Sequence, residues 1–119
     1  MFLHIKDVLT PEEITFFRQA LGPQAPWIEG TRSAGGQAIH QKNNLQLAQG
    51  SELSAQLQTM VKAALHRNAL FFSAALPRRI YNPLFNNYGD GANFYGNHVD
   101  SAVMHSKADN CWVRSDLSC

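Results

Sequence analysis

The sequence predicts an α+β fold in which helices come first and most strands come late. A strong helix start at Thr10-Pro11-Glu12-Glu13 and a later apolar stripe at helical spacing predict the helices. A strand pattern becomes clear only after Pro77. We therefore expect helices near residues 11–21 and 52–66 on one face of a small, mainly antiparallel sheet. The strands of this sheet are expected near residues 2–5, 27–29 and 80–87.

Each expected helix has a start signal. Thr10 can cap the first helix, and Pro11 suits its first position. Glu13 completes a capping box with Thr10, and Gly22-Pro23 ends the helix. Ser51 can cap the second helix. Its apolar stripe consists of Leu53, Leu57, Met60, Val61, Ala64 and Leu65.

The remaining segments are shorter or less regular. Residues 2–5 alternate weakly, as a short strand does, and residues 27–29 suit a second strand. Residues 30–50 are polar and contain glycines, which predicts a long loop or irregular ribbon. Residues 69–75 are apolar nearly all round, so we expect them to extend or follow the second helix into a buried position. Residues 78–88 have strand character.

Composition excludes several classes of function. The chain has 119 residues, of which 45% are hydrophobic and 16% charged, with a net charge of +1. This near-neutral balance does not favour nucleic acid as a partner. No stretch approaches the roughly 18 apolar residues that span a bilayer, and the start lacks the basic region of a signal peptide. We therefore expect no membrane partner. Two cysteines are too few for a disulfide scaffold, so we expect a cytoplasmic protein.

The candidate for chemistry is a His-x-Asp pair, His98 and Asp100. In a strand, residues i and i+2 point to the same face, so the imidazole and the carboxylate would lie side by side. That is two-thirds of the 2-His-1-carboxylate triad that holds non-heme Fe(II) and leaves positions open. The alternative is a surface histidine beside a surface aspartate, which the bare spacing does not exclude.

Two tyrosines flank this pair. Tyr88 lies ten residues before His98, and Tyr95 lies three residues before it. A tyrosine near a metal can offer its hydroxyl to a carboxylate while the ring keeps out water. The alternative for both is core packing with a hydroxyl that reaches solvent.

Several segments together resemble the bacterial PKHD-type hydroxylases, which are iron- and 2-oxoglutarate-dependent dioxygenases related to prolyl and lysyl hydroxylases. The resemblance extends from about Leu3 to Ser118 and covers the N-terminal half of a family whose members are about twice this length. It rests on residues 69–78, Pro83-Leu84-Phe85-Asn86-Asn87-Tyr88, Tyr95-Gly96-Asn97-His98-Val99-Asp100, Lys42-Asn43-Asn44 and Trp112-x-Arg114-x-Asp116-Leu117-Ser118.

The resemblance implies a double-stranded β-helix, or jelly-roll, preceded by helices. Residues 1–77 would form the N-terminal helical and mixed region, and residues 78–119 the start of the β-core, truncated in this chain. His98 and Asp100 match the family's first two iron ligands. Tyr88 matches a tyrosine that lines the 2-oxoglutarate pocket, and Tyr95 matches a second aromatic residue in the same motif. The resemblance therefore implies Tyr88 and Tyr95 as the residues that contact 2-oxoglutarate.

The same resemblance implies Fe(II) as the metal, 2-oxoglutarate as co-substrate and L-ascorbate as a further cofactor. It implies hydroxylation of a substrate that these residues do not specify. No position matches the family's distal histidine ligand or the arginine that binds 2-oxoglutarate. His105 and His40 are weaker candidates for a third ligand. Because this histidine and this arginine are unmatched, we expect the chain to be an inactive fragment. We also expect it to be marginally folded or to self-associate, because a half-built sheet leaves strand edges unpaired.

Two other classes of function remain open from the sequence. The chain could be a non-catalytic interaction module that uses its helices as a binding surface. It could also bind zinc or another metal through His98 and Asp100 with a ligand from elsewhere. Metal analysis of the purified chain tests the metal-binding alternative.

Overall fold

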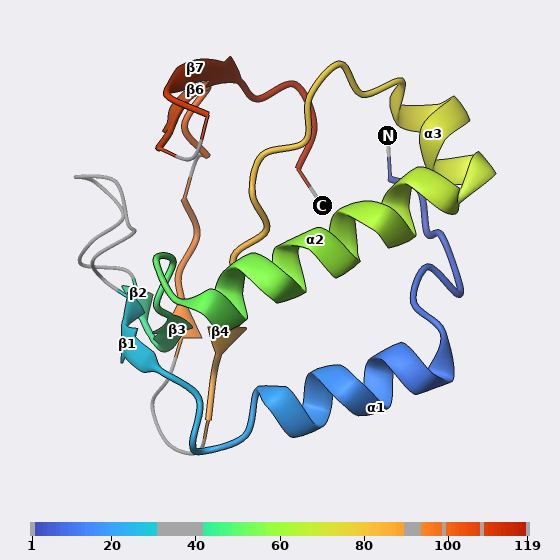
Figure 1. Ribbon diagram of the computed structural model, residues 1–119. Coiled ribbons are helices and arrows are strands. Elements are labelled where there is room, and N and C mark those ends of the chain that lie inside the picture. The colour runs from blue at the N-terminus through green and yellow to red at the C-terminus, as the bar shows by residue number, and fades with distance from the viewer. Residues whose placement is uncertain (1, 31–41, 90–93, 99, 108, 119) are drawn as a thin grey trace. The chain divides into compact units, whose positions relative to one another are not determined.

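Three helices and seven short strands form the part of the chain that this computed structural model describes, which is residues 2–30, 42–89, 94–98, 100–107 and 109–118 (Figure 1). The helices are α1 (Pro11–Ala20), α2 (Glu52–Arg67) and α3 (Ala69–Ala75). The strands are β1 (Trp27–Glu29), β2 (Lys42–Asn43), β3 (Leu45–Leu47), β4 (Asn86–Asn87), β5 (Phe94–Tyr95), β6 (Val103–Ser106) and β7 (Cys111–Arg114).

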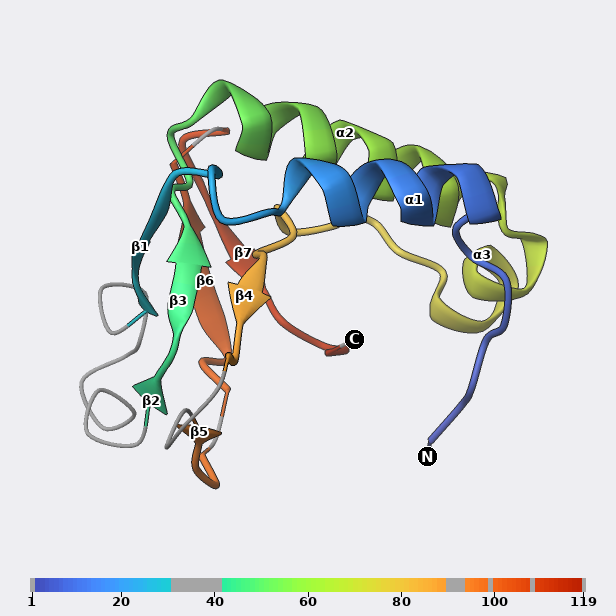
Figure 2. The ribbon, with the colours of Figure 1, turned by 90° about the horizontal axis from the view of Figure 1, so that it is seen from below.

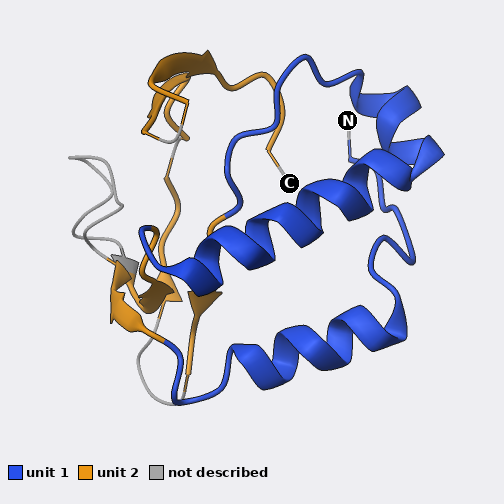
Figure 3. Ribbon diagram, viewed as in Figure 1, with its two compact units in different colours: residues 1–25, 50–83 blue, residues 26–49, 84–119 orange. Residues whose placement is uncertain are grey.

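The chain divides into two compact units (Figure 3). One unit comprises residues 1–25 and 50–83 and holds the three helices. The other comprises residues 26–49 and 84–119 and holds all the strands. Among the described residues, no helix has both the length and the apolar character needed to cross a membrane.

The predicted capping box at the start of α1 is confirmed. The Thr10 hydroxyl accepts a hydrogen bond from the Glu13 N–H (3.2 Å), and the Glu13 carboxylate accepts one from the Thr10 N–H (2.9 Å). Glu13 also accepts a hydrogen bond from Arg67 Nη1 at 2.8 Å. Arg67 is the last residue of α2, so this ion pair joins the end of α2 to the start of α1 within the helical unit.

Helix α2 buries one stripe of its surface, as its apolar spacing predicts. Leu57 and Ala64 are fully buried, and both belong to the predicted stripe. Asn68 then ends α2 and caps α3, because its side chain accepts a hydrogen bond from the Phe71 N–H at 2.9 Å. The helix predicted at residues 69–75 is therefore confirmed, but its burial is wrong, since α3 has no buried residue and Phe72 is 45% exposed.

Strand β3 is the centre of the main sheet. It pairs antiparallel with β1 on one side and with β4 on the other, giving the order β1-β3-β4 (Figure 2). The preceding strand β2 pairs antiparallel with β5, with Lys42 opposite Tyr95. Residues 42–47 therefore support two segments that follow much later in the sequence. Of the long loop or irregular ribbon predicted over residues 30–50, residues 42–43 and 45–47 are short strands, and residues 31–41 lie outside the described residues.

A separate hairpin, β6–β7, completes the strand unit. Its register places His105 opposite Trp112 and Ser106 opposite Cys111. The Ser106 hydroxyl donates to Asp109 in the connecting turn at 2.7 Å. All strand pairs in the described structure are antiparallel, as predicted.

Two of the predicted strands differ from the structure. Residues 2–5 form no strand, because no other described segment pairs with them, and Phe2 is 95% exposed. Of residues 80–87, only Asn86–Asn87 form a strand. Pro83 has no N–H to donate, and its carbonyl instead accepts a hydrogen bond from the Gln58 side chain of α2 at 3.1 Å. The α+β class, the helices and the strand at residues 27–29 are confirmed.

Buried amides connect the strands of the main sheet. Asn44 is 6% exposed and Gln46 is 1% exposed. Asn44 Nδ2 donates to the Leu45 carbonyl (3.1 Å) and to Asn86 Oδ1 (2.9 Å), and Gln46 Nε2 approaches the same Asn86 oxygen at 3.4 Å. Gly30 lies directly against the Asn44 side chain, where a β-carbon would fall 1.9 Å from Asn44 Oδ1.

Candidate metal centre

The predicted pair is adjacent in the structure. His98 Nε2 and Asp100 Oδ1 lie 3.3 Å apart. The His98 side chain is 25% exposed and the Asp100 side chain 57%, so the pair is accessible from solvent. Neither residue lies in a strand, and this corrects the expectation that strand alternation would align them.

A backbone carbonyl two residues earlier fixes the imidazole. His98 Nδ1 lies 2.7 Å from the Gly96 carbonyl oxygen. Since that oxygen can only accept, Nδ1 carries the proton and donates it. This local hydrogen bond engages a carbonyl that a β-ladder would otherwise use, which is consistent with β5 ending at Tyr95.

The hydrogen bond at Nδ1 determines what Nε2 can do. When the imidazole is neutral, a proton on Nδ1 leaves Nε2 with a lone pair that faces the Asp100 carboxylate. Two acceptors at 3.3 Å repel each other unless a positive charge lies between them. Either a proton on Nε2 or a bound cation supplies that charge.

The geometry of the pair fits a metal ion. Neighbouring ligands of an octahedral cation lie about 3 Å apart, because bonds of about 2.1 Å meet at right angles. The separation of His98 Nε2 and Asp100 Oδ1 is close to that value. Metal-ligating histidines almost always donate their other N–H to a carboxylate or backbone carbonyl, as His98 does to Gly96.

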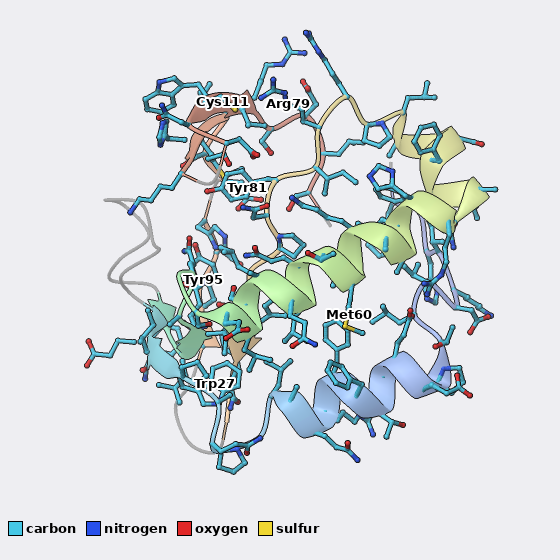
Figure 4. All side chains as sticks on the ribbon, in the orientation of Figure 1. Trp27, Met60, Arg79, Tyr81, Tyr95 and Cys111 are labelled. Carbon is cyan, nitrogen blue, oxygen red and sulfur yellow. The ribbon has the colours of Figure 1, made fainter. Side chains whose placement is uncertain are left out.

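Tyr95 stacks on the imidazole. The ring centroids of Tyr95 and His98 are 3.7 Å apart, and the rings are inclined by only 16°. Tyr95 lies at the end of β5, and Figure 4 labels its side chain in the strand unit. The predicted role of Tyr95 beside 2-oxoglutarate stays a prediction, whereas its contact with His98 is a feature that the sequence did not indicate.

Tyr88 interacts electrostatically with the same cluster. Burial raises the pKa of the Tyr88 phenol above its ordinary value, and the nearby Tyr95 phenol raises it further. The side chain is nevertheless 45% exposed. Tyr88 therefore remains a hydrogen-bond donor throughout the physiological pH range. Among the predicted site residues, the structure brings His98 into contact with Tyr95 and Asp100.

A third protein ligand is not found within the described residues. No group of three His, Cys, Asp or Glu side chains there is arranged to hold a metal ion. His105, a weaker candidate, is exposed on β6 and packs edge-on against Trp112 with centroids 5.1 Å apart. The other candidate, His40, lies outside the described residues.

Sequence reasoning missed two parts of this centre. No sequence feature identifies the Gly96 carbonyl as the partner of His98, because any residue at that position supplies a backbone carbonyl. The supporting strand β2 lies in a polar segment, and its pairing with β5 joins residues more than 50 positions apart. Only the resemblance drew attention to Lys42-Asn43-Asn44.

The chain is similar over its whole length to curated bacterial proteins. It is 50% identical over 119 residues to a PKHD-type hydroxylase of Variovorax paradoxus, covering 100% of this chain and 52% of that protein. The corresponding protein of Aliarcobacter butzleri is 46% identical over the same coverage. PKHD-type hydroxylase YbiX of Escherichia coli is 47% identical over 118 residues, covering 99% of this chain and 51% of YbiX. No protein-family model matches the chain.

These matches support the class that the sequence motifs indicated. The chain is a homologue of hydroxylases, and within that class its relatives are bacterial PKHD-type hydroxylases, as predicted. It spans about half the length of the curated relatives it matches.

Proposed function

We propose that the chain contributes to an Fe(II)- and 2-oxoglutarate-dependent dioxygenase, with His98 and Asp100 as two of the three iron ligands. The observation that carries this proposal is the 3.3 Å approach of Nε2 to Oδ1 while Nδ1 is engaged by the Gly96 carbonyl. The names of the relatives support hydroxylation as the reaction class.

Each residue then has a definite task. His98 and Asp100 bind the metal, and the Gly96 carbonyl keeps the imidazole proton on Nδ1. Tyr88 stays protonated and can donate its hydroxyl to a carboxylate of 2-oxoglutarate. Iron, when bound, supplies the oxidation chemistry at the positions that its protein ligands leave open.

The proposal also assigns what this chain does not supply. A facial triad needs a third ligand, and 2-oxoglutarate is best held by an arginine that contacts both carboxylate oxygens. The resemblance matches neither residue to a position here. The chain alone should therefore bind a divalent cation weakly and form no succinate, with or without L-ascorbate.

The direct test is a metal titration of the 119-residue chain. Mn²⁺ replaces Fe²⁺ because it is stable in air and prefers similar ligands. We expect Mn²⁺ to broaden the NMR signals of residues beside His98 and Asp100, and His98→Ala or Asp100→Ala to abolish the broadening. His105→Ala is the matched control and should behave as wild type. Broadening that persists in His98→Ala and Asp100→Ala would contradict the ligand assignment. Tight binding of zinc would favour the metal-binding alternative.

Catalysis is tested in a hybrid protein. In it, this chain replaces the matching region of the Variovorax paradoxus relative. We expect succinate formation that depends on Fe²⁺ and 2-oxoglutarate, that Asp100→Ala abolishes, and that His105→Ala retains. Full activity in Asp100→Ala would refute the assignment, and an active 119-residue chain would reveal a ligand that we have missed.

Three further expectations belong to the same proposal. The strands would be part of a jelly-roll of which this chain holds the first portion, with the β-core beginning near residue 78. The isolated chain would be marginally folded or self-associate, consistent with the high exposure of Val103 (52%) and Trp112 (72%) on the β6–β7 hairpin. The protein would act in the cytoplasm.

A further inference from the structure

Two independent contacts hold the His98 imidazole. The hydrogen bond to the Gly96 carbonyl selects which ring nitrogen faces Asp100. The Tyr95 ring, stacked at 3.7 Å and 16°, selects the plane of the imidazole. Neither contact alone fixes both properties, because an imidazole can rotate about a single hydrogen bond and can slide or flip on a flat ring.

We propose that Tyr95 is a positioning residue that holds the His98 imidazole in the orientation needed to bind a cation with Asp100. This inference rests on the proposed function and adds a residue to it. It differs from the role that the sequence suggested for Tyr95, which was contact with 2-oxoglutarate.

The backbone of Tyr95 is suited to this task. It lies opposite Lys42 in the β2–β5 pair, which fixes the base of the side chain three residues before His98. Gly96 directly follows, so the stacking ring and the accepting carbonyl belong to neighbouring residues. Within the short segment from Tyr95 to His98, two neighbouring residues thus contact the imidazole.

The stack should strengthen when a cation binds. A metal draws electron density from the imidazole, and a more positive ring is attracted to the electron-rich face of tyrosine. The face of the ring performs this role, and the hydroxyl is not needed for it. Phenylalanine at position 95 should therefore retain the positioning role, whereas leucine should lose it.

A contrasting pair serves as an internal control. His105 also contacts an aromatic ring, that of Trp112, but edge-on, with 66° between the rings. Trp112→Leu removes an aromatic neighbour from a histidine that we do not assign to the metal. It should change the His105 signals and leave metal binding as in wild type.

The test uses NMR on the 119-residue chain with Mn²⁺ as the probe. In wild type we expect His98 in the Nδ1–H tautomer, with ring protons shifted upfield by the Tyr95 ring and those of the exposed His4 serving as reference. In Tyr95→Leu the upfield shift should disappear, and the apparent Mn²⁺ affinity should fall about tenfold, as for other outer-shell partners. Tyr95→Phe should retain both the upfield shift and the wild-type affinity.

The possible outcomes separate the two proposals. Wild-type affinity in Tyr95→Leu, together with loss of binding in His98→Ala, would overturn the positioning role and leave the proposed function intact. Mn²⁺ binding that survives His98→Ala would overturn the proposed function and the positioning role with it. The wild-type spectrum is decisive even if Tyr95→Leu fails to fold, because His98 ring protons without an upfield shift would show that the stack is absent.

Discussion

Replacing Gly30 with alanine should disrupt the main sheet through one identifiable clash. A β-carbon at Gly30 would lie 1.9 Å from Asn44 Oδ1 and 2.9 Å from the Asn44 carbonyl oxygen. That carbonyl cannot withdraw easily, because it accepts the Gly30 N–H at 2.8 Å. The Asn44 side chain must therefore move.

The magnitude follows from what Asn44 would lose. Its Nδ2 donates to the Leu45 carbonyl and to Asn86 Oδ1, and each such hydrogen bond contributes about 1 kcal/mol. Loss of both gives a destabilisation of about 2 kcal/mol for Gly30→Ala, within the usual range for overpacking of a buried site. Asn44→Ala should cost a similar amount, since it deletes the same donor.

A double-mutant cycle tests the cause. Urea denaturation followed by tryptophan fluorescence gives the free energy of unfolding of Gly30→Ala, Asn44→Ala and the double variant. We expect the double variant to be only slightly less stable than Asn44→Ala, because no Asn44 side chain remains to be displaced. Stability of Gly30→Ala within about 0.5 kcal/mol of wild type, or full additivity in the cycle, would refute this explanation.

Three other predictions concern separate parts of the chain. The Arg67 guanidinium and the Thr10 N–H lower the pKa of Glu13 from 4.5 to about 2, so the stabilisation from the ionised carboxylate is complete above pH 4.5 and is lost as the pH falls toward 2. Denaturation curves at pH 5 and pH 2.5 should therefore differ less in Glu13→Gln than in wild type, and an equal difference would contradict the ion pair. The raised pKa of Tyr88 predicts a tyrosine that ionises later than a free phenol in an ultraviolet titration, and Tyr88→Phe should remove that late component. Leu47→Ala should destabilise the chain by about 2–4 kcal/mol because Leu47 is 1% exposed, whereas Leu45→Ala, at 44% exposed on the same strand, should cost less than about 1 kcal/mol, and equal losses would show that burial is not the cause.

The helices were predictable because their signals are local. The capping box of Thr10 and Glu13 is complete within four residues, and the buried positions Leu57 and Ala64 follow from spacing alone. A strand forms only when it pairs with another segment. The strands here are too short for their alternation of polar and apolar residues to predict them. Residues 2–5 have strand-like alternation but no partner among the residues that the structure describes. Residues 42–47 look like a loop, yet they pair with other strands.

The candidate centre was predictable in its residues and not in its geometry. The His-x-Asp spacing identified His98 and Asp100, but the expected strand alternation does not bring them together. The described contacts of the imidazole are instead with the Gly96 carbonyl and the stacked Tyr95 ring. Contacts of this kind depend on backbone direction at single residues, which a sequence pattern does not specify.

Under the proposed function, the centre would divide into a local part, formed near residues 95–100, and a third ligand that the described residues do not supply. Every described contact that orients His98 arises between Tyr95 and Asp100, with β2 as support. The two-ligand geometry can thus form within this chain before any third ligand arrives. Since the hydrogen bond at Nδ1 leaves Nε2 facing a carboxylate, this arrangement already favours a cation. A third ligand would then raise the affinity and fix the coordination geometry of a site whose first two ligands are already oriented.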